Sequence, residues 1–266
     1  MKIMCAQIDV KQAAFAENLQ RANECCASAH ANNCDLVVLP EMFTGGFNYA
    51  KNRAFLRENA DFFKKSLGEI AKNNSVAVCG SMPALANGDC VKNRLHFFDK
   101  TGFELCAYDK MHLFSPFHED KYISRGTAPV ILNGFCGFNI GLAVCYDLRF
   151  PELFRQMAFA GANMFIVVAA WPHPRLGHFT TLCRARAIEN QAYMVAVNQS
   201  GTENFGSKSA KYFGLSQIID PWGEVLACAK QDAPDNVCAE VFPETATEVR
   251  EKIPAFKDAY FYKNCR

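Results

Sequence analysis

The sequence of 266 residues contains no long apolar run. The longest uninterrupted run, Met164 to Trp171, has eight residues, whereas a membrane-spanning helix needs about 20. The first residues also lack the apolar core of a signal peptide, and Lys2–Ile8 is typical of a first strand instead. We therefore expect no membrane partner and a cytoplasmic location.

The sequence also lacks an excess of either charge sign. Lys and Arg number 28 and Asp and Glu number 27, for a formal net charge of +1. Because no basic run or stripe is present, we expect no nucleic-acid partner. The chain is 50% apolar and 21% charged, which excludes intrinsic disorder. No Ser/Gly/Pro-rich linker interrupts it, so we expect one domain over residues 1–266, with a C-terminal tail from about residue 243.

Paired cysteine motifs are missing as well, although the chain has 13 cysteines. No two stand as C-x-x-C, and no Cys and His positions repeat at zinc-finger spacing. An odd number of thiols scattered through apolar segments fits a reducing compartment. We expect most of these cysteines to be small buried hydrophobic residues.

Several common catalytic motifs are absent. The chain contains no G-x-G-x-x-G, no P-loop, no G-x-S-x-G elbow and no H-E-x-x-H. Its six histidines form no pair at positions i and i+4. The sequence therefore lacks the usual signals of dinucleotide chemistry, P-loop phosphoryl transfer, elbow-type serine hydrolysis and zincin chemistry.

Short apolar runs alternate with helical patterns in both halves of the chain. Apolar residues repeat at steps of four and three from Phe15 to Ala29 and from Leu56 to Ile70, which predicts one helix over each range. Two more helices are expected, from about Pro151 and over Phe179–Asn190. This alternation predicts a layered α/β protein, compatible with two packed sheets covered by helices. The expected strands are Lys2–Ile8, Asp35–Leu39, Val76–Ser81, Arg94–Asp99, Glu104–Tyr108, Asn139–Val144, Met164–Ala170, Tyr193–Asn198, Leu215–Ile219, Glu224–Ala229 and Val237–Phe242, with turns at Asn87–Gly88, Lys100–Gly102 and Asp220–Gly223.

Three polar residues follow directly after apolar strands. They are Glu41, Lys110 and Cys145. Taken singly, a Glu or Lys in such a place is usually an exposed loop residue, and a Cys is usually part of the core. Together they could perform acyl transfer, because a thiol nucleophile needs a base and a group that stabilises the oxyanion. A carboxylate in a dry pocket can serve as the base, and Cys145 precedes a helix start with free N–H groups.

Three segments carry a family resemblance: Leu39–Phe43, Tyr108–Phe114 and Val144–Leu153. They resemble the nitrilase superfamily of carbon–nitrogen hydrolases. Arg184–Gln191 and Asp220–Gly223 also look like family segments, so the resemblance runs from about residue 2 to about residue 242. It implies a four-layer α-β-β-α sandwich and a single hydrolase domain. It also implies chemistry without metal or cofactor, and a homodimer or larger homo-oligomer.

The resemblance also implies a Glu-Lys-Cys triad. Glu41 would be the general base and acid, Lys110 the oxyanion stabiliser and Cys145 the nucleophile that forms a thioester as ammonia leaves. Many relatives carry a second Glu, which here matches Glu119, with Asp120 as the adjacent candidate. Both also fit exposed loop carboxylates.

The same segments suggest further site residues. The backbone N–H of Tyr146 would share the oxyanion with Lys110. Asp147 and Arg149 either form an ion pair that braces the Cys segment, which we favour, or Arg149 faces the ligand. Trp171 either forms a wall of the substrate pocket or belongs to the core.

Pro40–Phe47 and Ala169–Pro172 resemble the bacterial omega-amidase branch, which acts on 2-oxo dicarboxylic acid monoamides. A substrate carboxylate would need a cation, with Arg149, Arg175 and Lys121 as candidates. Within the family, an N-carbamoyl amine hydrolase or a deaminated-glutathione amidase is the alternative. A catalytically silent binding module is the alternative from another class. All three residues of the implied triad are present, which argues against it.

Overall fold

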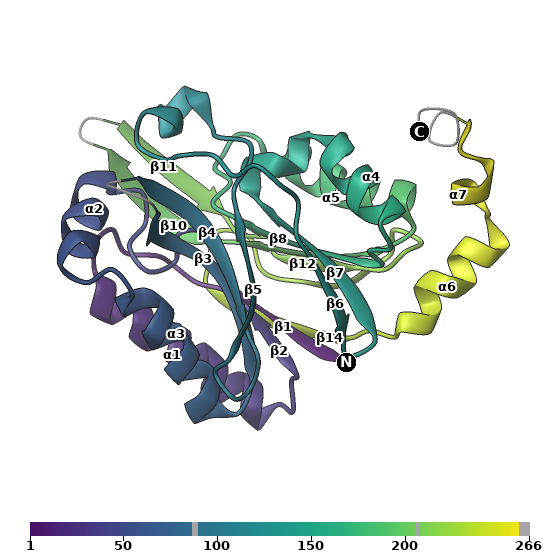
Figure 1. Ribbon diagram of the computed structural model, residues 1–266, viewed down its shortest axis with the longest axis horizontal. Helices are drawn as coiled ribbons and strands as arrows, with labels where there is room; N and C mark the ends of the chain where they lie inside the picture. Colours follow the sequence, from purple (N-terminus) through teal and green to yellow (C-terminus); the bar gives the residue numbers. More distant parts are fainter. Residues whose placement is uncertain (87–89, 206–207, 261–266) are drawn as a thin grey trace.

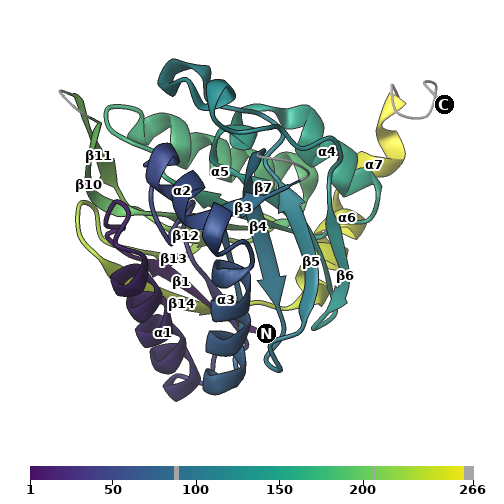
Figure 2. The same cartoon turned by 60° about the vertical axis from the view of Figure 1, so that its left-hand side comes forward.

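The computed structural model describes residues 1–86, 90–205 and 208–260. Two six-stranded sheets pack face to face, and helices cover the outer face of each. Figures 1 and 2 show the four layers, with α1 (Phe15–Ala31) and α3 (Phe62–Asn74) on one outside and α4 (Pro151–Phe159) and α5 (Leu176–Asn190) on the other. The predicted α-β-β-α sandwich is confirmed.

The first sheet consists, from edge to edge, of β14 (Asp235–Glu240), β1 (Lys2–Gln7), β2 (Leu36–Val38), β3 (Ala77–Leu85), β4 (Val91–Phe98) and β5 (Glu104–Asp109). Strands β1, β2 and β3 are parallel, whereas β14 and β4 are antiparallel to their neighbours. Because β5 is antiparallel to β4, it runs in the same direction as β2. The carboxyl ends of β2 and β5 therefore lie at the same edge of this sheet.

The second sheet consists of β13 (Val225–Cys228), β12 (Gln217–Ile219), β9 (Tyr193–Asn198), β8 (Met164–Ala169), β7 (Phe138–Val144) and β6 (Ile131–Phe135). Strands β7, β8 and β9 are parallel. Apolar side chains such as Ile3 and Val38 from the first sheet and Ile140 and Val168 from the second fill the space between the sheets. Strands buried on both faces explain the continuous apolar runs of the sequence.

The single helix predicted over residues 56–70 is wrong, because the structure has two helices there. α2 (Tyr49–Glu58) begins after Asn48, whose side chain accepts a hydrogen bond from the Lys51 N–H at 3.1 Å, and α3 follows after a short break. Leu56 of α2 and Phe63 of α3 are both buried. The apolar spacing stays in phase across the break and therefore does not reveal it.

Strands β6, β10 (Ser200–Phe205) and β11 (Lys208–Phe213) do not appear among the predicted strands. β10 and β11 pair only with each other, as a two-stranded hairpin. β10 is mostly polar, so it lacks the apolar alternation by which a strand is predicted. The predicted turn at Asn87–Gly88 lies outside the described residues.

The expected C-terminal tail contains helix α6 (Pro243–Lys252) and the short α7 (Ala255–Asp258). The Arg250 guanidinium donates hydrogen bonds to the carbonyls of Ala162 at 2.7 Å, Gln191 at 3.2 Å and Asn190 at 3.3 Å. Helix α6 is therefore fixed to the end of α5 and to the loop before β8.

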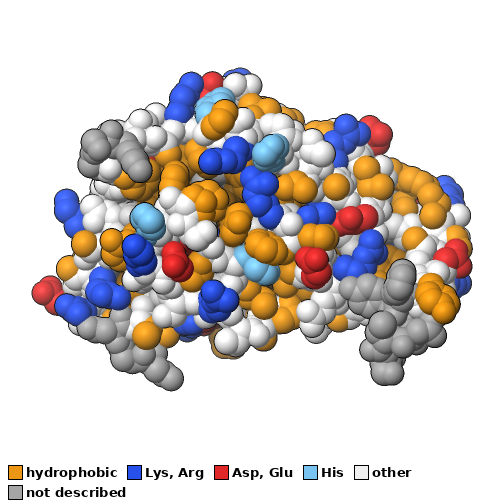
Figure 3. All heavy atoms as spheres, turned by 90° about the horizontal axis from the view of Figure 1, so that it is seen from above, with side chains coloured by type: hydrophobic (Ala, Val, Ile, Leu, Met, Phe, Trp, Pro, Cys, Tyr) orange, Lys and Arg blue, Asp and Glu red, His pale blue; other side chains and the backbone are white. Residues whose placement is uncertain are grey.

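No helix within the described ranges has both the length and the apolar character of a membrane span. On the face shown in Figure 3, basic side chains and a few acidic ones are scattered among hydrophobic and neutral ones. Charge alone does not mark a site on this face.

Candidate active site

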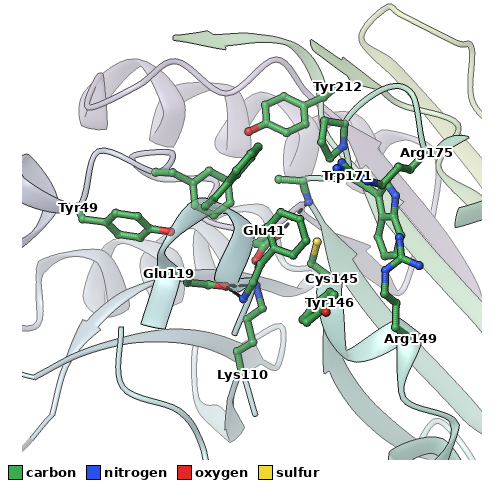
Figure 4. Close-up of a pocket in the computed structure, with 15 residues that line it drawn as sticks. Glu41, Tyr49, Lys110, Glu119, Cys145, Tyr146, Arg149, Trp171, Arg175 and Tyr212 are labelled. Atoms are coloured by element: carbon green, nitrogen blue, oxygen red, sulfur yellow. Dashed lines mark hydrogen bonds and ion pairs between the residues drawn. The ribbon is translucent and has the colours of Figure 1, made fainter. Parts of the chain in front are cut away.

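One cavity lies where the carboxyl ends of strands from both sheets meet. Glu41 follows β2, Lys110 follows β5 and Cys145 follows β7, and all three line this cavity (Figure 4). The empty space among its lining residues is about 490 Å³, including the part that opens to solvent. The structure therefore brings together the three polar residues predicted from strand ends.

Lys110 is the centre of a buried ionic cluster. Its Nζ donates to Glu41 Oε1 at 2.8 Å and to Glu119 Oε2 and Oε1 at 2.8 and 3.0 Å. Glu41, Lys110 and Glu119 are only 1%, 2% and 2% exposed. Asn93 Nδ2 bridges the two carboxylates, at 2.8 Å from Glu41 and 3.3 Å from Glu119. Asp120 is exposed, so of the two adjacent carboxylates Glu119 is the one that contacts Lys110.

Burial and the opposing charges determine how these groups hold protons. Burial raises the pKa of Glu41, and the nearby Glu119 carboxylate raises it further against the opposite effect of Lys110. Burial alone would lower the pKa of Lys110, but the carboxylates of Glu119 and Glu41 outweigh it and hold that pKa well above its usual value. Burial and the Glu41 carboxylate raise the pKa of the Cys145 thiol. These shifts favour the protonated thiol of Cys145 and the ammonium form of Lys110.

Cys145 occupies a strained turn. Its φ is 47°, in the left-handed region that a side chain with a Cβ rarely adopts. A 3₁₀ turn over Cys145–Arg149 follows and leads into α4. The thiol lies within hydrogen-bonding reach of the Glu41 carboxylate and the Ala170 amide. Ala170 N–H also donates to Glu41 Oε2 at 3.0 Å, so the residue directly after β8 helps to orient the carboxylate.

Asp147 fixes the turn, although not through the ion pair with Arg149 that we favoured. Its carboxylate accepts hydrogen bonds from Val144 N–H at 2.9 Å, Tyr108 O–H at 2.8 Å and His112 N–H at 3.0 Å. Tyr108 and His112 flank Lys110 in the sequence. Asp147 therefore ties the segment that carries Lys110 to the turn that carries Cys145.

Arg149 lies at the wall of the cavity instead. Its guanidinium carbon is 4.7 Å from the centroid of the Trp171 ring, and its Nη2 donates to His178 Nδ1 at 3.2 Å. Trp171 is buried and also lines the cavity, so it forms part of the wall as well as of the core. Arg175 lines the same cavity, whereas Lys121 is exposed and is not part of its lining. Figure 4 shows Arg149, Arg175 and Trp171 on one side of Cys145.

Tyr146 lines the cavity beside Cys145, and its ring packs edge-on against Phe114 with centroids 5.1 Å apart. Several other lining residues were not predicted, although Phe47, Phe114 and Pro172 lie within segments of family resemblance. These additional residues are Phe47, Tyr49, Phe114, Phe117, Pro172 and Tyr212. Asn93 was missed too; its place at the start of a strand beside Lys110 is visible only once strand pairing is known.

Curated proteins of similar sequence carry amidase names. The chain is 36% identical over 257 residues to the 2-oxoglutaramate amidase of Bacillus subtilis, covering 96% of each chain. It is 36% identical over 225 residues to the omega-amidase YafV of Escherichia coli K12, covering 85% of this chain and 84% of the relative. It is 32% identical over 266 residues to the deaminated glutathione amidase of Dictyostelium discoideum, covering 90% and 87%.

Solved structures agree in fold. A CN-hydrolase superfamily protein from Xanthomonas campestris, solved with an arsenic adduct in its active site, has a TM-score of 0.85 at 28% identity and covers 98% of this chain and 97% of its own. An amidase from Nesterenkonia sp. AN1 has the same fold, with a TM-score of 0.84 at 24% identity, covering 97% and 99%. The sequence model of the carbon-nitrogen hydrolase family matches residues 2–251. The chain belongs to the carbon–nitrogen hydrolase family.

Proposed function

We propose that this enzyme hydrolyses the terminal amide of a small 2-oxo dicarboxylic acid monoamide, through a thioester on Cys145. The observation that carries this proposal is one cavity that holds the Cys145 thiol among Glu41, Lys110 and Glu119 and has arginine side chains in its wall. The 2-oxoglutaramate amidase and omega-amidase names of the relatives support the substrate class.

In the proposed acylation, the Cys145 proton passes to Glu41 as the sulfur attacks the amide carbon. Burial raises the pKa of Glu41, which makes its carboxylate a better base near neutral pH. The C–N bond then breaks as Glu41 delivers the proton to nitrogen, and ammonia leaves. Water attacks the thioester, gives its proton to Glu41 and releases the acid, and the thiol takes the proton back.

Oxyanion stabilisation falls to Lys110 and the backbone of Tyr146. Lys110 remains protonated because Glu119 and Glu41 hold its pKa high. Tyr146 lies in the 3₁₀ turn directly after Cys145, and N–H groups in a first turn have no partner within that turn. Charge that develops on oxygen in a buried site is stabilised strongly by such fixed donors.

The substrate carboxylate would bind at the arginine side of the cavity. Arg149 and Arg175 line it, and Lys121 does not. The Trp171 ring beneath Arg149 holds the guanidinium in place. A substrate carboxylate bound at this side of the cavity without a cation would be desolvated and unpaired, which would cost several kcal/mol of binding free energy.

An ammonia-release assay tests the substrate class. We expect a 2-oxo dicarboxylic acid monoamide to be hydrolysed far better than its methyl ester, and Cys145→Ala to release no ammonia from either. Equal kcat/KM for acid and ester would contradict the omega-amidase proposal. Hydrolysis of N-carbamoyl amines or of deaminated glutathione in its place would favour those two alternatives.

Arg149→Met sharpens this test, because Met keeps an unbranched apolar stem against Trp171. We expect KM for the acid to rise about 10- to 100-fold, as one charge-assisted contact contributes roughly 1.5–3 kcal/mol. KM for the ester should stay unchanged. Lys121→Met is the matched control, since it removes an exposed cation outside the cavity.

We also propose that two copies associate and that the enzyme works in the cytoplasm. Ile188 of α5, Trp222 and Ile253 are 51%, 43% and 51% exposed. Ile188 lies against the turn at Gly223, and Lys252 Nζ lies 5.8 Å from the Trp222 ring centroid. These three side chains form what we call the α5–α6 apolar surface, which would suit a second copy. The twelve cysteines that the structure describes are free thiols, which supports a reducing compartment.

A further inference from the structure

Glu203 of β10 is a buried carboxylate that the proposed chemistry does not use. It is 2% exposed. Its Oε1 accepts hydrogen bonds from Phe47 N–H at 2.6 Å and Gln12 Nε2 at 3.3 Å, and its Oε2 accepts one from Tyr212 O–H at 3.0 Å. In the part of the chain that the structure describes, all of these donors are uncharged. A carboxylate buried without a cation is unfavourable for folding, so its position calls for another explanation.

The contacts of Glu203 join two segments that are distant in the sequence. Phe47 lies in the loop that follows Glu41, and Tyr212 lies on β11 of the hairpin that β10 begins. Gly46 has a φ of +58°, and a Cβ at that position would lie 2.2 Å from Glu203 Oε1. The loop therefore fits closely around this carboxylate and has no room for a side chain there.

Phe47 and Tyr212 both line the cavity that contains Cys145. Figure 4 shows the Tyr212 ring across the cavity from Lys110, with Glu41 and Cys145 between them. The hydrogen bonds of the ionic cluster come from other residues: Asn93, Ala170 and the Phe114 amide, which donates to Glu119 Oε2 at 2.7 Å. Glu203 thus holds the wall of the cavity without contacting the cluster.

We propose that Glu203 is a positioning residue that clamps Phe47 and Tyr212 together as the substrate-facing wall and so sets substrate affinity. It leaves the reactivity of the Cys145 thiol unchanged. This inference rests on the proposed amide hydrolysis, but not on which amide is the substrate.

Glu203→Ala, Glu203→Gln and Tyr212→Phe test this role in the full-length protein. KM and kcat are measured for the amide that the unmodified enzyme hydrolyses best, and the rate of Cys145 alkylation by iodoacetamide is followed by mass spectrometry. We expect Glu203→Ala to raise KM about tenfold or more, with kcat and the alkylation rate changed less than about threefold, because only uniform binding is lost. Glu203→Gln keeps an acceptor for Phe47 N–H and a donor to the Tyr212 oxygen, and should restore KM to within about threefold.

Tyr212→Phe removes one of the two wall contacts and should give an intermediate KM with an unchanged alkylation rate. If Glu203→Ala does not fold, Tyr212→Phe still tests whether the contact between Glu203 and Tyr212 sets KM. Glu224→Gln, at an exposed glutamate in the β12–β13 turn, is the control and should leave all three quantities unchanged. The inference is overturned if KM stays the same in the Glu203 and Tyr212 variants, or if kcat and the alkylation rate fall while KM does not. An enzyme that releases ammonia only from another amide class would refute the proposed substrate but leave this test intact.

Discussion

Glu41 is the residue whose proton transfers the proposed mechanism uses most often. We expect Glu41→Gln to lower kcat by about 10²–10⁴-fold, because glutamine keeps the shape of the side chain but cannot accept the thiol proton. The rate of ammonia release measures this loss, and a circular dichroism spectrum checks that the fold is intact. A variant with normal rate would show that Glu41 is only a partner of Lys110.

Glu119 should affect the pKa of Glu41, because both carboxylates contact Lys110 Nζ. Its negative charge raises the pKa of Glu41, so Glu119→Gln should lower that pKa. Activity needs the Glu41 carboxylate and is lost as the pH falls through its pKa. The acidic limb of the kcat/KM profile should therefore move to lower pH in Glu119→Gln, and stay in place in the exposed control Asp120→Asn. A shift to higher pH would contradict this charge coupling.

Single residues were predictable where a motif fixed them. Glu41, Lys110 and Cys145 each follow an apolar strand and lie in segments of family resemblance, and the structure brings them together. The choice between Glu119 and Asp120 was open, because adjacent residues of one turn point in different directions. Glu203 belongs to a polar strand without a motif, so its burial depends on contacts with distant residues that spacing does not encode.

At the scale of elements, Asp147 joins the end of β5 to the end of β7. Asp147→Asn replaces one carboxylate oxygen by an NH₂ group that faces donors. We expect the free energy of unfolding in urea to fall by roughly 1.5–3 kcal/mol, as charge-assisted hydrogen bonds are lost. The kcat should fall too, because Tyr108 and His112 position the segment of Lys110. Asp120→Asn serves again as an exposed control, and equal stability of the two variants would show that Asp147 does not hold the junction.

Most elements with an apolar period or an apolar run were predicted, but the period over residues 56–70 hid a break between two helices, and the polar hairpin was missed. The strands from Lys2 and from Met164 begin at their predicted residues, and α1 begins at Phe15 as expected. β10 and β11 escaped prediction because they pack as a hairpin beside the sheets and bury polar groups such as Glu203. The break between α2 and α3 lies at Asn59, the C-cap of α2, whose Nδ2 donates to the Phe55 carbonyl at 3.1 Å. Apolar spacing does not register such a cap.

At the scale of the whole molecule, periodicity alone predicted α/β layers but not their order. Strand order depends on pairings between distant segments, such as β1 with β14, which joins Lys2 to Glu240. The resemblance to carbon–nitrogen hydrolases supplied the four-layer sandwich, and the structure confirms it. The site needs this global order, because Glu41 and Lys110 come from one sheet and Cys145 from the other.

Association of two copies is the remaining property of the whole molecule. The α5–α6 apolar surface exposes Ile188 beside Trp222. A second copy that covers these side chains would remove their apolar area from water, which favours association. We expect the protein to sediment as a dimer at micromolar concentration and Ile188→Asp to sediment as a monomer, because the interface would then bury an unpaired charge. Phe103→Asp is the matched control, since Phe103 is 68% exposed in a turn of the other sheet. A monomeric unmodified protein would contradict the proposed association. A dimer that persists in Ile188→Asp but dissociates in Phe103→Asp would show that the interface lies elsewhere.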